Sequence, residues 1–349
     1  MTKRFLLLAL AGAFASEAQT LSLKQREIGA LGNERIAGFA IAGRKLATWG
    51  DRVRWWNLPD GKSARPGPRG PFAEGATILD VNGDGQLDLV VNESAAPRAL
   101  VWLEAPKWTR HVIDTGVDTA DVIPGELFGR RGILLVQRRA QVRFYEIPPH
   151  SVDRWPVTEI YSFYTPSDQG GLALADIDGD GRPDILCGNY WIRSPESFEL
   201  PWRLFAIELW NEQPHSAMLR LALLGPGELV AMQREMPEGR LARFEKPADP
   251  KQLWVEHRIT DSLAFNEARS LDAADLDGDG RPDVIIGEKG GAARLIAFLN
   301  RGMGQFEAHV IANHVAADHI RAIGLEGHGR PDLLTIGKGV ISWWKNLTR

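Results

Sequence analysis

The sequence predicts an all-β protein, a seven-bladed β-propeller in which every blade has four strands. Three observations lead to this prediction. An aspartate- and glycine-rich loop recurs with a period close to 49 residues, each copy precedes a short apolar run, and a large aromatic residue follows each run in register. Repeats of four short strands at this length are typical of propeller blades arranged radially around a channel.

The recurring loop is most complete at Asp275–Asp283, where aspartates stand at positions 1, 3, 5 and 9 and glycines at positions 4 and 6. Residues 176–184 repeat the pattern, residues 80–88 repeat it with Asn82 at position 3, and a worn copy at 324–332 lacks the first carboxylate. The glycines permit the positive φ that a tight turn requires. The β-branched run that follows, such as Val284–Ile286, predicts a strand.

This spacing of carboxylates predicts three calcium sites, because Ca²⁺ takes six to eight oxygens from carboxylates, backbone carbonyls and water. Position 7 would contribute its backbone carbonyl. The predicted ligands are Asp80, Asn82, Asp84, Gln86 and Asp88; Asp176, Asp178, Asp180, Arg182 and Asp184; and Asp275, Asp277, Asp279, Arg281 and Asp283. An EF-hand is excluded because position 12 of the third loop is Ile286 rather than glutamate. The alternative is that the loops are plain solvated turns.

Three further units complete the set of seven. Residues 122–136 and 221–232 keep a turn and an apolar strand without the aspartates, and the first unit begins at residue 36. The aromatic residues of the third strands are expected to pack between units; they are Trp55 and Trp56, Trp102, Phe144 and Tyr145, Trp191, Phe244, Phe298, and Trp343 and Trp344. Five units share a last strand, at 108–113, 155–160, 202–207, 254–259 and 306–311.

The two ends of the chain are expected to close the ring. The last unit stops at its third strand, 341–347, whereas residues 21–28 offer a strand that no unit uses. Pairing of these N- and C-terminal strands within one blade would cover sheet edges that otherwise stay exposed. Residues 19–349 would then form a single propeller domain.

Residues 1–15, or 1–18, are predicted to be a signal peptide. Lys3 and Arg4 precede an apolar run that ends in the small-residue pattern Ala13-Phe-Ala15. The run is short for a transmembrane span, so we expect a secreted or periplasmic protein without a membrane span after cleavage; an N-terminal anchor is the alternative. The net charge of −4 gives no support to nucleic-acid binding. The single cysteine, Cys187, excludes an internal disulfide and is expected in the core.

The loops at 80–88, 176–184 and 275–283 resemble the FG-GAP/VCBS repeat family, whose propellers are similar to the head of integrin α subunits. The resemblance covers residues 21–347. It implies calcium in the hairpin loops between the first and second strands of a blade, all on one face of the disc. Members include adhesion modules, polysaccharide lyases and sugar dehydratases, so the fold alone does not select a function.

On the opposite face, the loops that lead into the innermost strands are expected to surround the channel mouth. They carry the predicted ligand-binding residues Tyr164, His215, Glu267, Arg269 and His319, together with Glu74, Asp118, Asp121, Asp168, Gln169, Asn266, Asp318 and Arg321. We therefore expect a monomeric, exported, calcium-binding module that binds a carbohydrate or a protein at the channel mouth.

The alternative function is a carbon–oxygen lyase, either a polysaccharide lyase or a sugar dehydratase. Histidine, tyrosine and arginine would then serve as the base, the proton donor and the cation that neutralises a uronate carboxylate. The remaining alternative is that these polar residues bind no ligand and only line a water-filled channel.

Overall fold

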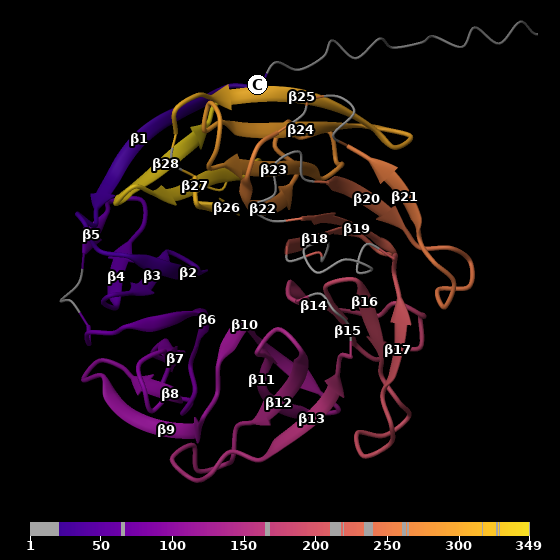
Figure 1. Ribbon diagram of the computed structural model, residues 1–349. Coiled ribbons are helices and arrows are strands. Elements are labelled where there is room, and N and C mark those ends of the chain that lie inside the picture. Colours follow the sequence, from indigo (N-terminus) through magenta and orange to yellow (C-terminus); the bar gives the residue numbers. More distant parts are fainter. Residues whose placement is uncertain are drawn as a thin grey trace, which may run out of the picture.

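The structure is a computed structural model that describes residues 21–348 except 64–66, 165–167, 210–217, 219, 234–239, 260–262, 264, 316, 326 and 328. The strands form seven antiparallel sheets of four strands each, arranged as a ring (Figure 1). The predicted fold class is confirmed. Among the described residues, no helix is long and apolar enough to cross a membrane.

Each blade takes consecutive strands, from the channel to the rim. The first three blades contain β2 (Ile36–Ala42), β3 (Lys45–Gly50), β4 (Arg54–Asn57) and β5 (Lys62–Ser63); β6 (Phe72–Leu79), β7 (Asp88–Glu93), β8 (Ala99–Glu104) and β9 (Thr109–Thr115); and β10 (Thr119–Leu127), β11 (Arg130–Gln137), β12 (Gln141–Glu146) and β13 (Val157–Ser162).

The other four blades follow the same order, except that the seventh takes its outermost strand from the N-terminus. They contain β14 (Leu172–Ala175), β15 (Asp184–Cys187), β16 (Tyr190–Arg193) and β17 (Arg203–Ala206); β18 (Arg220–Gly225), β19 (Glu228–Met232), β20 (Leu241–Glu245) and β21 (Val255–Arg258); β22 (Ala268–Ala274), β23 (Asp283–Glu288), β24 (Leu295–Gly302) and β25 (Gln305–Ala312); and β26 (His319–Ile323), β27 (Asp332–Gly337), β28 (Val340–Asn346) and β1 (Leu23–Ala30).

The ring closes by pairing of the terminal strands, as predicted. Strand β1 runs antiparallel to β28, from Leu23 opposite Asn346 to Ala30 opposite Val340. In Figure 1 the indigo β1 accordingly lies along the yellow β28. This pairing covers an edge of β28 that would otherwise expose backbone N–H and C=O groups.

The core lies between the blades, where the sequence places its aromatic residues. Each of the seven apolar clusters combines side chains of two neighbouring blades; one of them joins Trp102 of β8 to Tyr145 of β12. Trp191, Phe244 and Phe298 are fully buried in the same way, so the predicted packing role of the aromatics is confirmed. Cys187 is also buried, between the third and fourth blades.

The last aspartate of each loop fastens its hairpin to the third strand of the same blade. The Asp283 carboxylate, which is fully buried, accepts the N–H of Leu276 at 2.8 Å and the N–H of Asn300 at 2.8 Å. Asp88 and Asp184 each accept two equivalent N–H groups. Asp332 in the worn loop accepts the N–H of Asn346 at 2.7 Å. Position 9 is therefore a fold-stabilising position, even in a loop that lacks the first carboxylate.

Replacing Asp332 tests this role where no calcium site is predicted. Asp332→Ala leaves the N–H of Asn346 buried without its acceptor, which costs about 1–3 kcal/mol of the free energy of unfolding. Chemical denaturation should show the same loss with calcium and with chelator. Asp153→Ala, at an exposed turn, is the control and should cost less than about 0.5 kcal/mol. A loss seen only in calcium would contradict the structural role.

Candidate functional site

The predicted calcium loops are the hairpins that join the first and second strands of the second, fourth and sixth blades. In the third loop Asp275 accepts three backbone N–H groups, from Gly278 at 2.7 Å, Asp279 at 3.1 Å and Gly280 at 2.9 Å. Asp80 and Asp176 make the same three bonds in their loops. The glycines at positions 4 and 6 of the third loop have φ of +80° and +87°, so the predicted left-handed backbone is confirmed.

Positions 5 and 7 are joined by a further short-range bond. The N–H of Arg281 donates to Asp279 at 2.9 Å, and the residues at position 7 of the other two loops, Arg182 and Gln86, donate to Asp180 at 3.0 Å and to Asp84 at 2.8 Å. These bonds turn the backbone around the carboxylates at positions 1 and 5. The loop geometry thus depends on the aspartates themselves.

Carboxylate oxygens of two loops lie close enough to share a cation. Oxygens of Asp176, Asp178 and Asp180 lie within 4.8 Å of one another, and so do oxygens of Asp275, Asp277 and Asp283. These donors suit a hard cation such as Ca²⁺. In the described part of the first loop, no three acidic or histidine side chains meet this criterion. There the amide of Asn82 donates to Glu104 at 3.1 Å.

Burial and repulsion both act on the carboxylates of these loops. Burial, with a smaller contribution from Asp277 and Asp279, raises the pKa of Asp283 to about 7. Burial likewise raises the pKa of Asp184 to about 6. A bound cation would favour the ionised form of both groups, because opposite charge lowers the pKa of a carboxyl.

Arginines already provide positive charge at the second and third loops. Arg193 forms an ion pair with Asp178, and Arg301 forms one with Asp277 at 2.7 Å. Burial opposes ionisation of Asp178, but the hydrogen bond and charge of Arg193 outweigh it and hold the pKa of Asp178 below its usual value.

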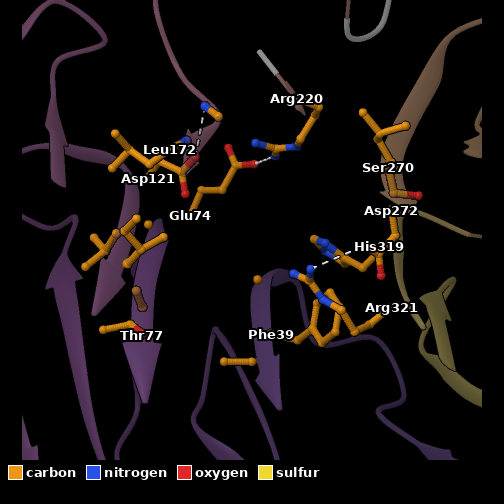
Figure 2. A pocket seen from close by; sticks show the side chains of 18 of the residues that line it. Phe39, Glu74, Thr77, Asp121, Leu172, Arg220, Ser270, Asp272, His319 and Arg321 are labelled. Carbon is orange, nitrogen blue, oxygen red and sulfur yellow. Dashed lines mark hydrogen bonds and ion pairs between the residues drawn. The ribbon is translucent and has the colours of Figure 1, made fainter. Parts of the chain in front are cut away.

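The channel is the second candidate site. Its cavity, of about 630 Å³, is lined by residues of all seven innermost strands, β2, β6, β10, β14, β18, β22 and β26. Figure 2 shows Glu74 pointing to Arg220 across this space and forming an ion pair with it. Asp121 accepts the N–H groups of Gly171 at 3.0 Å and of Leu172 at 3.2 Å, which connects β10 to β14.

A second charged group lies where β22 and β26 face β2. The Asp272 carboxylate accepts the N–H of Ala322 at 2.7 Å and lies 3.5 Å from the Arg321 guanidinium. Burial raises the pKa of Asp272, although Arg321 opposes the shift. Phe39 contacts both residues of β26 that face it: its ring lies 5.5 Å from the His319 ring and 5.8 Å from the Arg321 guanidinium carbon.

The structure brings two of the five predicted ligand-binding residues to this cavity. Arg269 and His319 line it from neighbouring blades, and Arg269 lies 3.9 Å from Asp318. Tyr164 is 96% exposed and Glu267 precedes β22; neither is among the residues that line the cavity. His215 lies outside the described residues.

The sequence-based prediction did not include Phe39, Arg220 and Asp272, which lie on the innermost strands β2, β18 and β22. It expected ligand-binding residues in loops, whereas Arg269 and His319 also lie on innermost strands, β22 and β26. A usable signal existed for two of the residues that it did not include. Arg220 begins the strand Arg220–Gly225, whose other residues are apolar, and Asp272 stands between Leu271 and Ala273 in the strand Ala268–Ala274. A charge in such a strand is costly unless it faces water or a partner.

Comparison with known proteins agrees with this architecture. The model of the FG-GAP repeat matches residues 268–295, which contain the third loop. No curated protein matches the sequence.

Solved structures share the fold at low sequence identity. BBS1N in complex with ARL6DN is similar with a TM-score of 0.60 and 11% identity, over 95% of this chain and 98% of that chain. The WD40 repeats of RRP9 give a TM-score of 0.59 and 11% identity, over 94% of this chain and 100% of that chain. YCF48 from Cyanidioschyzon merolae gives a TM-score of 0.58 and 9% identity, over 92% of this chain and 98% of that chain. These likenesses concern the fold alone. The chain is a seven-bladed β-propeller that carries an FG-GAP repeat at residues 268–295.

Proposed function

We propose that the protein is an exported, calcium-binding propeller that binds a ligand at the mouth of its central channel. The observation that carries the proposal is the cavity of about 630 Å³, into which charged side chains project from several blades. This volume lies in the usual range of small-molecule sites, about 300–1,000 Å³. Export is supported by the signal-like residues 1–15 and by the FG-GAP repeat, which is typical of extracellular proteins.

The ligand we favour is a carbohydrate. Glu74, Arg220, Asp272 and Arg321 offer acceptors and donors for hydroxyl groups, and the Phe39 ring lies beside them. Ion pairs and backbone hydrogen bonds fix the orientation of these side chains before a ligand arrives, which reduces the entropy cost of binding. A protein segment is the other ligand class; propellers commonly bind proteins, and the similar BBS1N was solved in complex with ARL6DN.

Calcium would be held by the carboxylates of the loops that begin at Asp80, Asp176 and Asp275, with the carbonyl groups of Gln86, Arg182 and Arg281. The support is the close approach of carboxylate oxygens in the second and third loops. Bound calcium supplies positive charge that relieves the repulsion among these carboxylates. Its role is structural, since the loops lie at the opposite ends of the innermost strands from Arg269 and His319.

A lyase is the second candidate function. The specific observation in its favour is that His319 and Arg269 line one cavity. A histidine near neutral pKa can remove a proton next to a uronate carboxylate, while an arginine neutralises that carboxylate.

Calcium should raise the melting temperature. At ten times its Kd, an ion that binds only the folded protein adds about 1.4 kcal/mol per site, or about 4 kcal/mol for three sites. We expect melting to be several degrees higher in millimolar calcium than in chelator, as followed by calorimetry. Asp279→Ala should remove about one third of this increment. Glu326→Ala, in the worn loop, should leave it unchanged. Identical melting temperatures in both buffers would show that the loops are only turns.

Removing the channel charges should weaken carbohydrate binding. We expect Arg269→Ala and His319→Ala to weaken binding of the best oligosaccharide, chosen from a panel of neutral and uronate-containing sugars, by about tenfold or more, because each loses a charged or polar contact. Titration calorimetry measures the change, and Arg54→Ala serves as the control outside the cavity. Binding of peptides but of no sugar would favour the protein ligand instead.

The lyase is tested separately by incubation with polygalacturonate. A lyase produces an unsaturated uronate, which absorbs in the ultraviolet, and His319→Ala should abolish its formation. Sugar binding without any such product would leave the binding module as the function.

A further inference from the structure

Two of the predicted calcium loops hold an arginine from the third strand of their own blade. Arg193, the last residue of β16, forms an ion pair with Asp178 and lies 3.4 Å from Asp180. Arg301 of β24 lies 2.7 Å from Asp277. Asp178 and Asp277 stand at position 3, and both belong to the groups of carboxylates whose oxygens lie within 4.8 Å of one another. The guanidinium groups thus contact the same carboxylates that a metal ion would need.

The first loop has the opposite arrangement. The N–H of Ala105 donates to Asp88 as the N–H of Ser194 donates to Asp184, so the residues before these donors, Glu104 and Arg193, occupy equivalent places. Position 3 of the first loop is the neutral Asn82, whose amide donates to Glu104 at 3.1 Å. At this place the second loop has Arg193, with Asp178 at position 3, and the first loop has Glu104, with Asn82 at position 3. In the third loop the residue whose N–H donates to Asp283 is Asn300, and Arg301 follows it.

The positive charge of these arginines is important because the carboxylates that they contact are buried. The side chain of Asp277 is 1% exposed and that of Asp178 is 12% exposed. A carboxylate with so little water, close to other carboxylates, is destabilising unless a cation or hydrogen bonds offset its charge. Arg301 and Arg193 meet this need in the metal-free loops.

We propose that Arg193 and Arg301 are built-in counter-cations of the second and third loops, and that they must leave Asp178 and Asp277 when calcium binds. This inference rests on the proposed calcium sites and concerns how they are regulated. The arginines lower the calcium affinity of their loops, because an ion pair is broken on binding. They also keep these blades folded when calcium is scarce.

The experiment uses the full-length, chelated protein. Asp84→Ala and Asp279→Ala, which disable the first and third loops, isolate the second site for calorimetric titration with Ca²⁺. In this background Arg193→Met should lower Kd by about threefold or more, since it removes one competing ion pair. Arg193→Lys keeps the charge and should stay closer to the parent protein. The matched control is Arg54→Met, which breaks a two-bond ion pair with Glu34, at 2.7 Å and 2.7 Å, outside the loops.

Melting of the otherwise unaltered protein in chelator provides the second measurement. Arg193→Met and Arg301→Met should each melt below wild type in chelator and approach it in saturating calcium. Arg54→Met should melt at a lower temperature by the same amount in both buffers. An unchanged Kd for Arg193→Met, or unchanged melting in chelator, would overturn the inference.

The outcomes separate this inference from the proposed function. Calcium uptake by Arg193→Met and Arg301→Met but not by wild type would support the counter-cation role and refute calcium binding by the natural protein. Uptake by wild type with no effect of either arginine would refute the counter-cation role alone. Uptake by neither wild type nor variants would refute both.

Discussion

The apolar contact between neighbouring blades is the interaction on which the rest of the structure depends, because each four-stranded sheet has two faces to cover and each blade covers one face of the next. Every one of the seven apolar clusters spans two blades. The contact between the last and first blades needs the ring to close, and β1 contributes Ile28 to that cluster. Closure in turn makes the first strand of every blade face the channel, which creates a space that all seven blades line.

The acidic loops follow from the same arrangement. Each loop returns the chain from the innermost strand to the second strand within a few residues, and the aspartates at positions 1, 5 and 9 build this turn by accepting backbone N–H groups. Gathering these carboxylates creates repulsion that the chain must offset. Backbone N–H groups offset it in part, and Arg193 and Arg301 add full positive charges at two loops. The carboxylates of the predicted calcium loops therefore also serve to build the turn itself.

In the channel, oppositely charged side chains form pairs. Its carboxylates and guanidinium groups face one another from different blades, as in the Glu74–Arg220 pair and in the Asp272–Arg321 pair. The first pair connects two blades across the channel, and the second connects two neighbouring blades. The acidic loops lie at one end of the innermost strands, and Arg269 and His319 lie at the other end.

The sequence by itself determined the seven repeats, the left-handed glycines, the burial of the aromatic residues and the pairing of the terminal strands. Each of these depends on spacing along the chain or on the count of strands, both of which can be read directly. Only the tertiary structure decided which charges meet. Arg220 and Glu74 are 146 residues apart, and Arg193 reaches Asp178 only because β16 ends beside the loop. These contacts depend on which blades the ring places opposite one another and on where each strand ends beside a loop, and no local pattern of residues encodes either of them.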